Sequence, residues 1–210
     1  MPKDLRKLYR DLKSDLVRIE KVHIRRFLKK PLATPSEYEL SVKAYLLLCH
    51  AAFEEFMEEI ATELLTSIEV NYIKHQKYSK ALACLLHFRS SNASELQNEK
   101  FKDDPFLVFT HIRTSLDSIK ASFANDIYNN NGAGIKYINR IMVPLGVQVT
   151  TDAGLLDSLK KLAKERGHYA HKRKSGGAIR HSLSPEDAKR VVSDCIKVFK
   201  DIRDKAIKLI

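Results

Sequence analysis

The chain has 210 residues, of which 44% are hydrophobic, 8% aromatic and 30% charged, a composition typical of a soluble globular protein with one sizeable core. Only seven glycines and six prolines are present, which disfavours collagen-like, loop-rich and all-β architectures because these require frequent turn residues. The 37 Lys and Arg residues outnumber the 26 Asp and Glu residues, and the resulting charge of +11 is expected of a protein that meets phosphates or an anionic surface.

The N-terminal residues 3–28 have the spacing of one amphipathic helix. Apolar residues recur there at intervals of three and four, with charged residues between them: Leu5, Leu8, Leu12, Leu16, Ile19 and Val22. Because proline cannot continue a helix, we expect Lys29-Lys30-Pro31 to end this one.

A long second helix is predicted to begin at Thr34-Pro35-Ser36-Glu37. This segment combines an N-cap hydroxyl, a proline at the first helical position and a glutamate three residues after the cap. The predicted apolar side of the helix contains Leu40, Ala44, Leu47, Leu48, Ala51, Ala52, Phe56 and Ile60. We expect the helix to reach about Ile68 and to bend or restart at Asn71, with a helical continuation from Tyr72 to Arg89.

The middle of the chain contains two further predicted helices. After a polar connection over residues 90–103, one helix opens at Asp104-Pro105 and runs to the break at Asn129-Asn130-Asn131-Gly132. A shorter helix covers Ile135 to Val143 and ends at Pro144.

Two helices are also predicted in the C-terminal region, residues 152–209. The first begins after the capping candidates Thr151-Asp152 and reaches about His171, where a basic, glycine-containing loop follows up to His181. Ser184-Pro185-Glu186-Asp187 repeats the cap, proline and acidic first-turn pattern, and a final amphipathic helix continues to Leu209.

These patterns predict an all-α, single-domain bundle of about six to seven helices over residues 1–210. The cysteines, Cys49, Cys84 and Cys195, are odd in number and widely spaced, so we expect reduced core thiols and neither a disulfide framework nor a CxxC site. The N-terminus has no secretory signal pattern. The longest apolar stretch, Ala44 to Phe53, is far shorter than a membrane span, so we expect a cytoplasmic protein without membrane association.

Charge is unevenly distributed along the chain. Residues 1–30 contain eleven basic and four acidic residues, and residues 160–190 contain ten basic and three acidic ones. Residues 35–70, by contrast, contain eight glutamates and one lysine. Two interpretations are open: the acidic helix pairs with the basic segments inside the bundle, or the basic segments form a phosphate-binding surface.

Most enzyme signatures are absent from the sequence: there is no P-loop, no GxGxxG, no HExxH, no GxSxG and no clustered Cys/His ligand set, which disfavours P-loop and zinc chemistry. What remains is Arg166-Gly167-His168-Tyr169-Ala170-His171 at the end of the penultimate helix, followed by Lys172-Arg173-Lys174. Arg18 and His23 have the same spacing, but they lie within a long charged helix, which is typical of a solvated face. A helix end beside a loop can admit a substrate.

The order of these features resembles the HEPN family of all-helical domains, whose mark is an Arg-polar-x-x-x-His motif where a late helix meets the following loop. The family's motif helix and closing helix resemble LLDSLKKLAKERGHYAHKRK and SLSPEDAKRVVSDCIKVFKDI. The early helix of the RiboL-PSP subgroup resembles AYLLLCHAAFEEFMEEI, and its short helix before the motif resembles IKYINRIMVPLGV. The resemblance covers about Tyr38 to Ile207.

The resemblance implies metal-independent RNA cleavage to 2′,3′-cyclic phosphate ends, with no cofactor. His171 would move protons near neutral pH, and the guanidinium of Arg166 would hold the phosphate. The family usually has Asn, Asp or His directly after the motif arginine, where this chain has Gly167. Either His168 supplies the polar group or the site is weakened.

The resemblance also implies a homodimer with a composite site made of two copies of Arg166 and His171. Lys172, Arg173 and Lys174 would then follow the RNA backbone, and Tyr169 would either stack on a base or pack in the protein. One of Glu54 and Glu58 would face the motif, unless both belong to a solvated acidic stripe. His50 has the character of a satisfied core or boundary histidine.

The leading hypothesis is therefore an HEPN-type endoribonuclease, with a toxin or defence effector as its biological setting and an antitoxin protein as a partner. One alternative is a non-catalytic HEPN-like module that binds RNA, nucleotides or a partner protein, which Gly167 favours. The other is a helical scaffold whose basic loop is only a solvated surface.

Overall fold

The structure is a computed structural model that describes residues 4–30, 32–89, 105–129, 132–171 and 183–209, with backbone alone for 89, 105 and 168–171. This part of the chain contains helices and turns and no strand. Its helices are α1 (Leu5–His23), α2 (Arg25–Leu28), α3 (Pro35–His75), α4 (Lys80–Arg89), α5 (Pro105–Tyr128), α6 (Ile135–Met142), α7 (Ala153–His171) and α8 (Pro185–Ile207). The predicted all-α class is confirmed.

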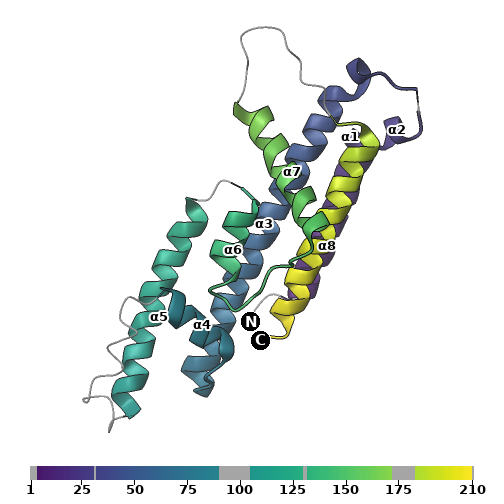
Figure 1. The fold of residues 1–210 in the computed structure, drawn as a ribbon. Helices are drawn as coiled ribbons and strands as arrows, with labels where there is room; N and C mark the ends of the chain where they lie inside the picture. The colour runs from purple at the N-terminus through teal and green to yellow at the C-terminus, as the bar shows by residue number, and fades with distance from the viewer. Residues whose placement is uncertain (1–3, 31, 90–104, 130–131, 172–182, 210) are drawn as a thin grey trace.

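Helix α3 is the axis of the bundle. Figure 1 shows α1, α7 and α8 along one half of this helix and α4, α5 and α6 along the other. Its buried side chains include Phe53, whose ring stacks on Phe199 of α8 with centroids 4.6 Å apart. Phe56 packs edge-on against the same Phe199 ring at 6.1 Å. Because α3 contacts neighbours on several sides, it fixes the relative positions of α5, α7 and α8.

The predicted start of α3 is confirmed. Thr34 and Glu37 form a capping box, in which the Glu37 carboxylate accepts the Thr34 backbone N–H at 2.7 Å. A hydrogen bond from Lys30 and those from Thr34 lower the pKa of Glu37 to about 2. The end of α3 differs from the prediction, because the helix passes through Asn71 without a break and ends at Gln76, which has a left-handed φ of 50°. Burial of Tyr72 keeps the helix continuous there.

Two expectations for the N-terminal segment are wrong. It is not one helix, because the backbone breaks at Ile24, a fully buried residue that separates α1 from α2. A second interruption, at Gln76, separates α3 from α4. With both interruptions the described residues contain eight helices, where about six to seven were predicted. Val22 was expected on the apolar face, but it is 65% exposed because the core-facing stripe of α1 ends before it.

The predicted apolar side of α3 is also partly wrong. Leu40 is 81% exposed, Leu48 is 44% exposed and Ala51 is exposed, whereas Phe56 and Ile60 are buried as expected. The three exposed residues share one face by their spacing, and Glu54, Glu55 and Glu58 continue that face towards the C-terminus. This exposed face of α3 therefore changes from apolar to acidic next to Ala51.

The remaining predicted helices agree with the structure. Asp152 caps α7 by accepting the Leu155 backbone N–H at 3.0 Å, and Ser184 caps α8 by accepting that of Asp187 at 3.0 Å. Cys49 and Cys195 are buried free thiols, while Cys84 is half-buried. The connection predicted over residues 90–103 and the basic loop after His171 lie outside the described residues. No helix among the described residues is long and apolar enough to cross a membrane.

Candidate functional site

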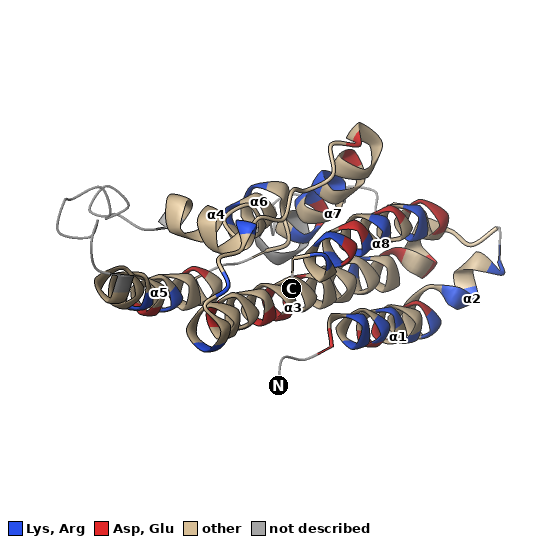
Figure 2. Cartoon of the chain, turned by 90° about the horizontal axis from the view of Figure 1, so that it is seen from below, with Lys and Arg blue, Asp and Glu red and all other residues tan. Residues whose placement is uncertain are grey.

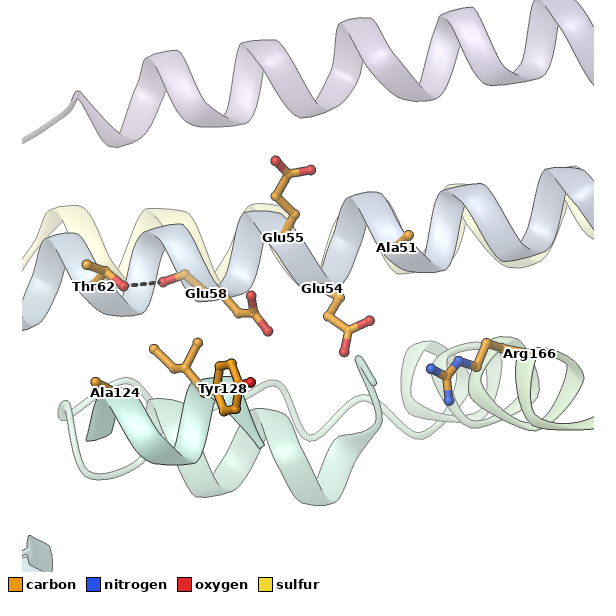
Figure 3. Close-up of a pocket in the computed structure, with 9 residues that line it drawn as sticks. Ala51, Glu54, Glu55, Glu58, Thr62, Ala124, Tyr128 and Arg166 are labelled. Atoms are coloured by element: carbon orange, nitrogen blue, oxygen red, sulfur yellow. Dashed lines mark hydrogen bonds between the residues drawn. The ribbon is translucent and has the colours of Figure 1, made fainter. Parts of the chain in front are cut away.

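An open pocket of about 690 Å³ lies where α3, α5 and α7 meet (Figure 3). It is lined by Ala51, Glu54, Glu55, Glu58, Thr62, Ala124, Ile127, Tyr128 and Arg166. Among the described side chains of this lining, Arg166, from the motif at the end of α7, is the cationic one, and the carboxylates of Glu54 and Glu58 on α3 are directed into the same space. The pocket therefore combines a guanidinium with an acidic wall.

Arg166 and Glu54 are directed towards one another from different helices, as Figure 3 shows. Burial raises the pKa of Glu54, while the charge of Arg166 and a backbone hydrogen bond from Gly132 act in the opposite direction. Arg166 itself is half-buried. A half-buried guanidinium directed towards a carboxylate presents several N–H donors to the pocket.

His50 lies behind Glu54, one turn earlier on α3. Its Nε2 accepts the backbone N–H of Ala133 at 3.1 Å, and its Nδ1 lies 3.8 Å from Oε2 of Glu54. Burial, with a smaller effect from Arg166, lowers the pKa of His50 to about 4. The ring is therefore neutral near pH 7, with its proton on Nδ1 because Nε2 is the acceptor. This confirms the interpretation of His50 as a satisfied core histidine.

The connection between α5 and α6 passes close to this histidine. Gly132 has a φ of 156°, and a Cβ on this residue would lie 3.5 Å from Cε1 of His50. Since 3.5 Å is an ordinary van der Waals contact, it is the positive φ of Gly132 that favours glycine here, and not the space beside the imidazole. His50, through Ala133, joins this connection to the part of α3 that contains Glu54.

The structure brings together some of the predicted site residues. Glu54 and Glu58 line the same pocket as Arg166, whereas Glu55 is directed towards α1 in Figure 3. His168, Tyr169 and His171 belong to the last turns of α7, but their side chains lie outside the described residues. Lys172, Arg173 and Lys174 also lie outside them. Their assigned roles therefore stay predictions.

Gly167 lies in the helix directly after Arg166, and open space surrounds it. A Cβ on this residue would have no heavy atom within 4 Å. Neither a left-handed backbone nor a close neighbour therefore requires glycine at this position. Local packing therefore does not explain why residue 167 is a glycine.

One wall of the pocket was not predicted from the sequence. Tyr128, which is 87% exposed, and Ala124 belong to α5, a helix that the sequence analysis did not connect with the motif. The local sequence does not predict that α5 lines the pocket, because α5 is positioned near Arg166 by its packing on α3. No group of His, Cys, Asp and Glu side chains in the described residues is arranged to hold a metal ion.

Acidic groups of the bundle also form pairs between helices. Lys120 of α5 donates to both carboxylate oxygens of Glu69 at 2.8 Å, and Lys189 of α8 donates to Glu20 at 2.9 Å. Neither of these pairs joins the acidic residues 35–70 to one of the two basic segments, whereas the pair between Lys30 and Glu37 does, so the acidic helix pairs with the N-terminal basic segment at Glu37.

Comparison with known proteins identifies the family of this chain. The family model RiboL-PSP-HEPN matches residues 3–208, almost the whole chain. The searches of curated proteins and of solved structures found no match to this chain. The family match includes the early helix with Glu54 and the late helix with Arg166, the two elements that meet at the pocket. The chain belongs to the RiboL-PSP-HEPN family of all-helical domains.

Proposed function

We propose that this protein is a metal-independent endoribonuclease that cleaves RNA to 2′,3′-cyclic phosphate ends. The observation that supports this most is the position of Arg166, half-buried at the end of α7 and lining an open pocket with Glu54 and Glu58. Arg18, the arginine of the other sequence match, is exposed on α1. A held arginine at an accessible helix end is suited to bind a phosphate.

The proposed reaction is attack of a ribose 2′-hydroxyl on the adjacent phosphorus, with departure of the 5′-oxygen of the next nucleotide. Imidazole, whose ordinary pKa is about 6.5, is suited to this proton transfer, and we assign it to His171. Arg166 would stabilise the charge that develops on the phosphoryl oxygens. Only RNA would be cut, because DNA lacks the attacking hydroxyl.

Glu54 is proposed to position Arg166. The Glu54 carboxylate is directed towards the Arg166 guanidinium and is partly buried. A carboxylate in this position can orient the planar guanidinium by accepting its hydrogen bonds. His50 would in turn keep this part of α3 fixed to the α5–α6 connection through Ala133. His168 remains a candidate for the polar group that Gly167 does not provide.

A homodimer is part of the proposal. On a regular helix, positions 166 and 171 lie about 140° apart around the axis, so one copy of α7 does not present both positions on one side. The exposed apolar residues Leu40, Leu48 and Ala51 share one face of α3, of which Ala51 lines the pocket, and this face suits a protein contact. A second copy packed there would place both motifs in one cleft.

The wider setting also belongs to the proposal. We assign Lys172, Arg173 and Lys174 to the RNA backbone and Tyr169 to a base. A toxin or defence effector, restrained by an antitoxin protein, is consistent with a ribonuclease of this kind. Gly167 favours the second candidate, a non-catalytic module that binds RNA, nucleotides or a partner protein, because it replaces the family's polar residue.

Cleavage of a labelled mixed-sequence RNA in EDTA tests the proposal. We expect cyclic phosphate ends from the wild-type protein and from the control variant Arg18→Ala/His23→Ala, which removes the same residue types at the same spacing on α1. Arg166→Ala and His171→Ala should each lower the rate at least about a hundredfold. RNA binding without cleavage by the folded wild type would favour the non-catalytic candidate.

A further inference from the structure

A second concave site lies between the beginning of α1 and the end of α8. It has a volume of about 610 Å³ and is lined by Arg6, Arg10, Arg203, Asp204, Ile207 and Lys208. Four of these side chains are cationic and one is a carboxylate, the reverse of the pocket near Arg166. We call this site the α1–α8 basic pocket. Figure 3 shows α1 on the side of α3 opposite to α5 and α7, so the two pockets are separate.

Arg203 is held rigidly in this pocket. Its Cζ lies 4.3 Å from the ring centroid of Tyr9, and its Nε donates to Oδ1 of Asp204 at 2.9 Å. The Arg203 side chain is only 17% exposed. Burial raises the pKa of Tyr9, so the ring beneath the guanidinium is a neutral phenol. An arginine stacked and paired in this way loses little conformational entropy when it binds an anion.

The other cations of the pocket are exposed and can converge on the same ligand. Arg6 and Arg10 lie one turn apart on α1 and therefore on one face of the helix. Arg10 is 3.8 Å from Asp4, in a pair whose side chains are 68% and 57% exposed and which is therefore weak. Lys208 is exposed just after the end of α8. The N-terminal end of α1 is capped by Asp4, whose Oδ1 accepts the Arg6 backbone N–H at 2.9 Å, so the cations of the pocket are its side chains.

Basic residues continue beyond the pocket along α1. Lys13 and Lys21 share the face of Arg6 and Arg10 by their spacing, and both are exposed. The acidic residues Asp11 and Asp15 fall on a different face of the same helix, and Glu20, which shares the basic face, is paired with Lys189 of α8. Figure 2 shows the blue basic residues along α1 and α8. A line of cations suits a chain of phosphates better than a single small anion.

We propose that the α1–α8 basic pocket binds phosphate groups of an RNA strand and is an anchor separate from the site at Arg166. The identity of the ligand as RNA rests on the proposed function, while the phosphate chemistry follows from the pocket itself. Guanidinium forks donate to phosphate oxygens in bidentate geometry, and Arg203, whose Nε and Nη2 donate to Asp204, has further N–H groups for a phosphate. The pocket reads no bases and no 2′-hydroxyl, so it should bind single-stranded DNA equally well.

The position of the pocket gives this proposal a specific consequence. Because α3 lies between the two pockets, a tetranucleotide bound at Arg166 cannot reach the α1–α8 basic pocket, whereas a long strand can. The pocket should therefore lower KM for long RNA and have no effect on the cleavage of a tetranucleotide. Substitution of a residue with a merely structural role would change the cleavage kinetics of long RNA and of the tetranucleotide to the same extent.

The test measures the Kd of a long single-stranded RNA by fluorescence anisotropy. It compares the double variant Arg6→Gln/Arg10→Gln with the protein that has the natural residues at positions 6 and 10. Both proteins also contain Arg166→Ala, which prevents cleavage during the titration. Arg113→Gln/Lys136→Gln is the matched control, since it removes two exposed cations from α5 and α6. We expect a tenfold or greater rise in Kd and a salt slope smaller by about two for the pocket variant. The control should change Kd by much less.

The outcomes separate the two proposals. Equal Kd values for the pocket variant and the control, with RNA cleavage intact, would overturn the anchor and leave the ribonuclease in place. Loss of affinity in the pocket variant of a protein that binds RNA without cutting it would support the anchor and contradict the ribonuclease. A wild type that binds no RNA would overturn both.

Discussion

Gly167 follows Arg166 directly, at the position where the resemblance to the family implies a polar residue. The open space around it means that a larger side chain can be accommodated without displacing a neighbour. Glycine within a helix also costs about 0.5 to 1 kcal/mol of stability relative to alanine. The position therefore offers a direct way to ask whether the missing polar group limits catalysis.

We predict that Gly167→Asn raises the RNA cleavage rate about tenfold or more, because a hydrogen bond to a charged group contributes about 1.5 to 3 kcal/mol. Gly167→Ala is the control, since it stiffens the helix without adding a polar group. Initial rates on one RNA substrate, with unfolding midpoints for each variant, measure the effect. Equal rates for both variants would show that the polar group is not what the wild type lacks.

His50 makes the stability of the fold depend on pH. Its pKa of about 4 in the folded protein lies below the ordinary value of 6.5, so the unfolded chain binds the proton more readily. The stabilisation is therefore complete above about pH 6.5 and is lost as the pH falls towards 4. Glu54, whose pKa is raised, acts in the opposite direction.

We predict that the free energy of unfolding falls by about 2 to 3 kcal/mol between pH 7 and about pH 4.5 through His50. Urea unfolding of the wild type and His50→Gln at both pH values isolates this contribution, because Glu54 and Arg166 are present in each protein. The glutamine amide can still accept the Ala133 N–H. If both proteins lost the same stability, the pH dependence would come from other groups.

Helix starts and helix ends differ in how far they follow from local sequence. Thr34-Pro35-Ser36-Glu37 and Ser184-Pro185-Glu186-Asp187 predict their helices correctly because capping involves residues within one turn. The end of α3 could not be predicted in this way. Tyr72 is buried by tertiary packing, which carries the helix past Asn71 to Gln76.

The same distinction explains the exposed face of α3. Helical spacing shows which residues share a side, but only the surrounding helices decide whether that side is covered. Leu40 and Leu48 have the pattern of core residues and yet are 81% and 44% exposed. These exposed leucines, on the face of α3 that also contains Ala51 of the pocket, are the basis for placing a second copy of the chain there.

We predict that Leu40→Glu/Leu48→Glu raises the dimer dissociation constant at least tenfold and lowers RNA cleavage, while the monomer stays folded because both positions are exposed. Val22→Glu is the matched control, as Val22 is 65% exposed on α1. Sedimentation across a concentration series gives the mass of each variant. An unchanged dimer in the double variant would place the interface elsewhere.

At the scale of the whole molecule, the fold class followed from periodicity and caps, while the site did not. Arg166 and Glu54 are more than a hundred residues apart in the sequence, and the family resemblance alone suggested that they meet. Their meeting depends on α7 packing against α3, which is a tertiary event. Tyr128 and the α1–α8 basic pocket were missed for the same reason, since each requires helices that are distant in the chain.

The central claim is that the 2′-hydroxyl of RNA is the nucleophile in a metal-free reaction. The most direct measurement compares, in EDTA, one RNA sequence with its fully 2′-O-methylated form, with product ends identified by mass spectrometry. We predict that the RNA is cut to 2′,3′-cyclic phosphates and that the methylated strand is bound but left intact. Cleavage of the methylated strand, or cleavage of RNA only when a divalent metal is added, would contradict it.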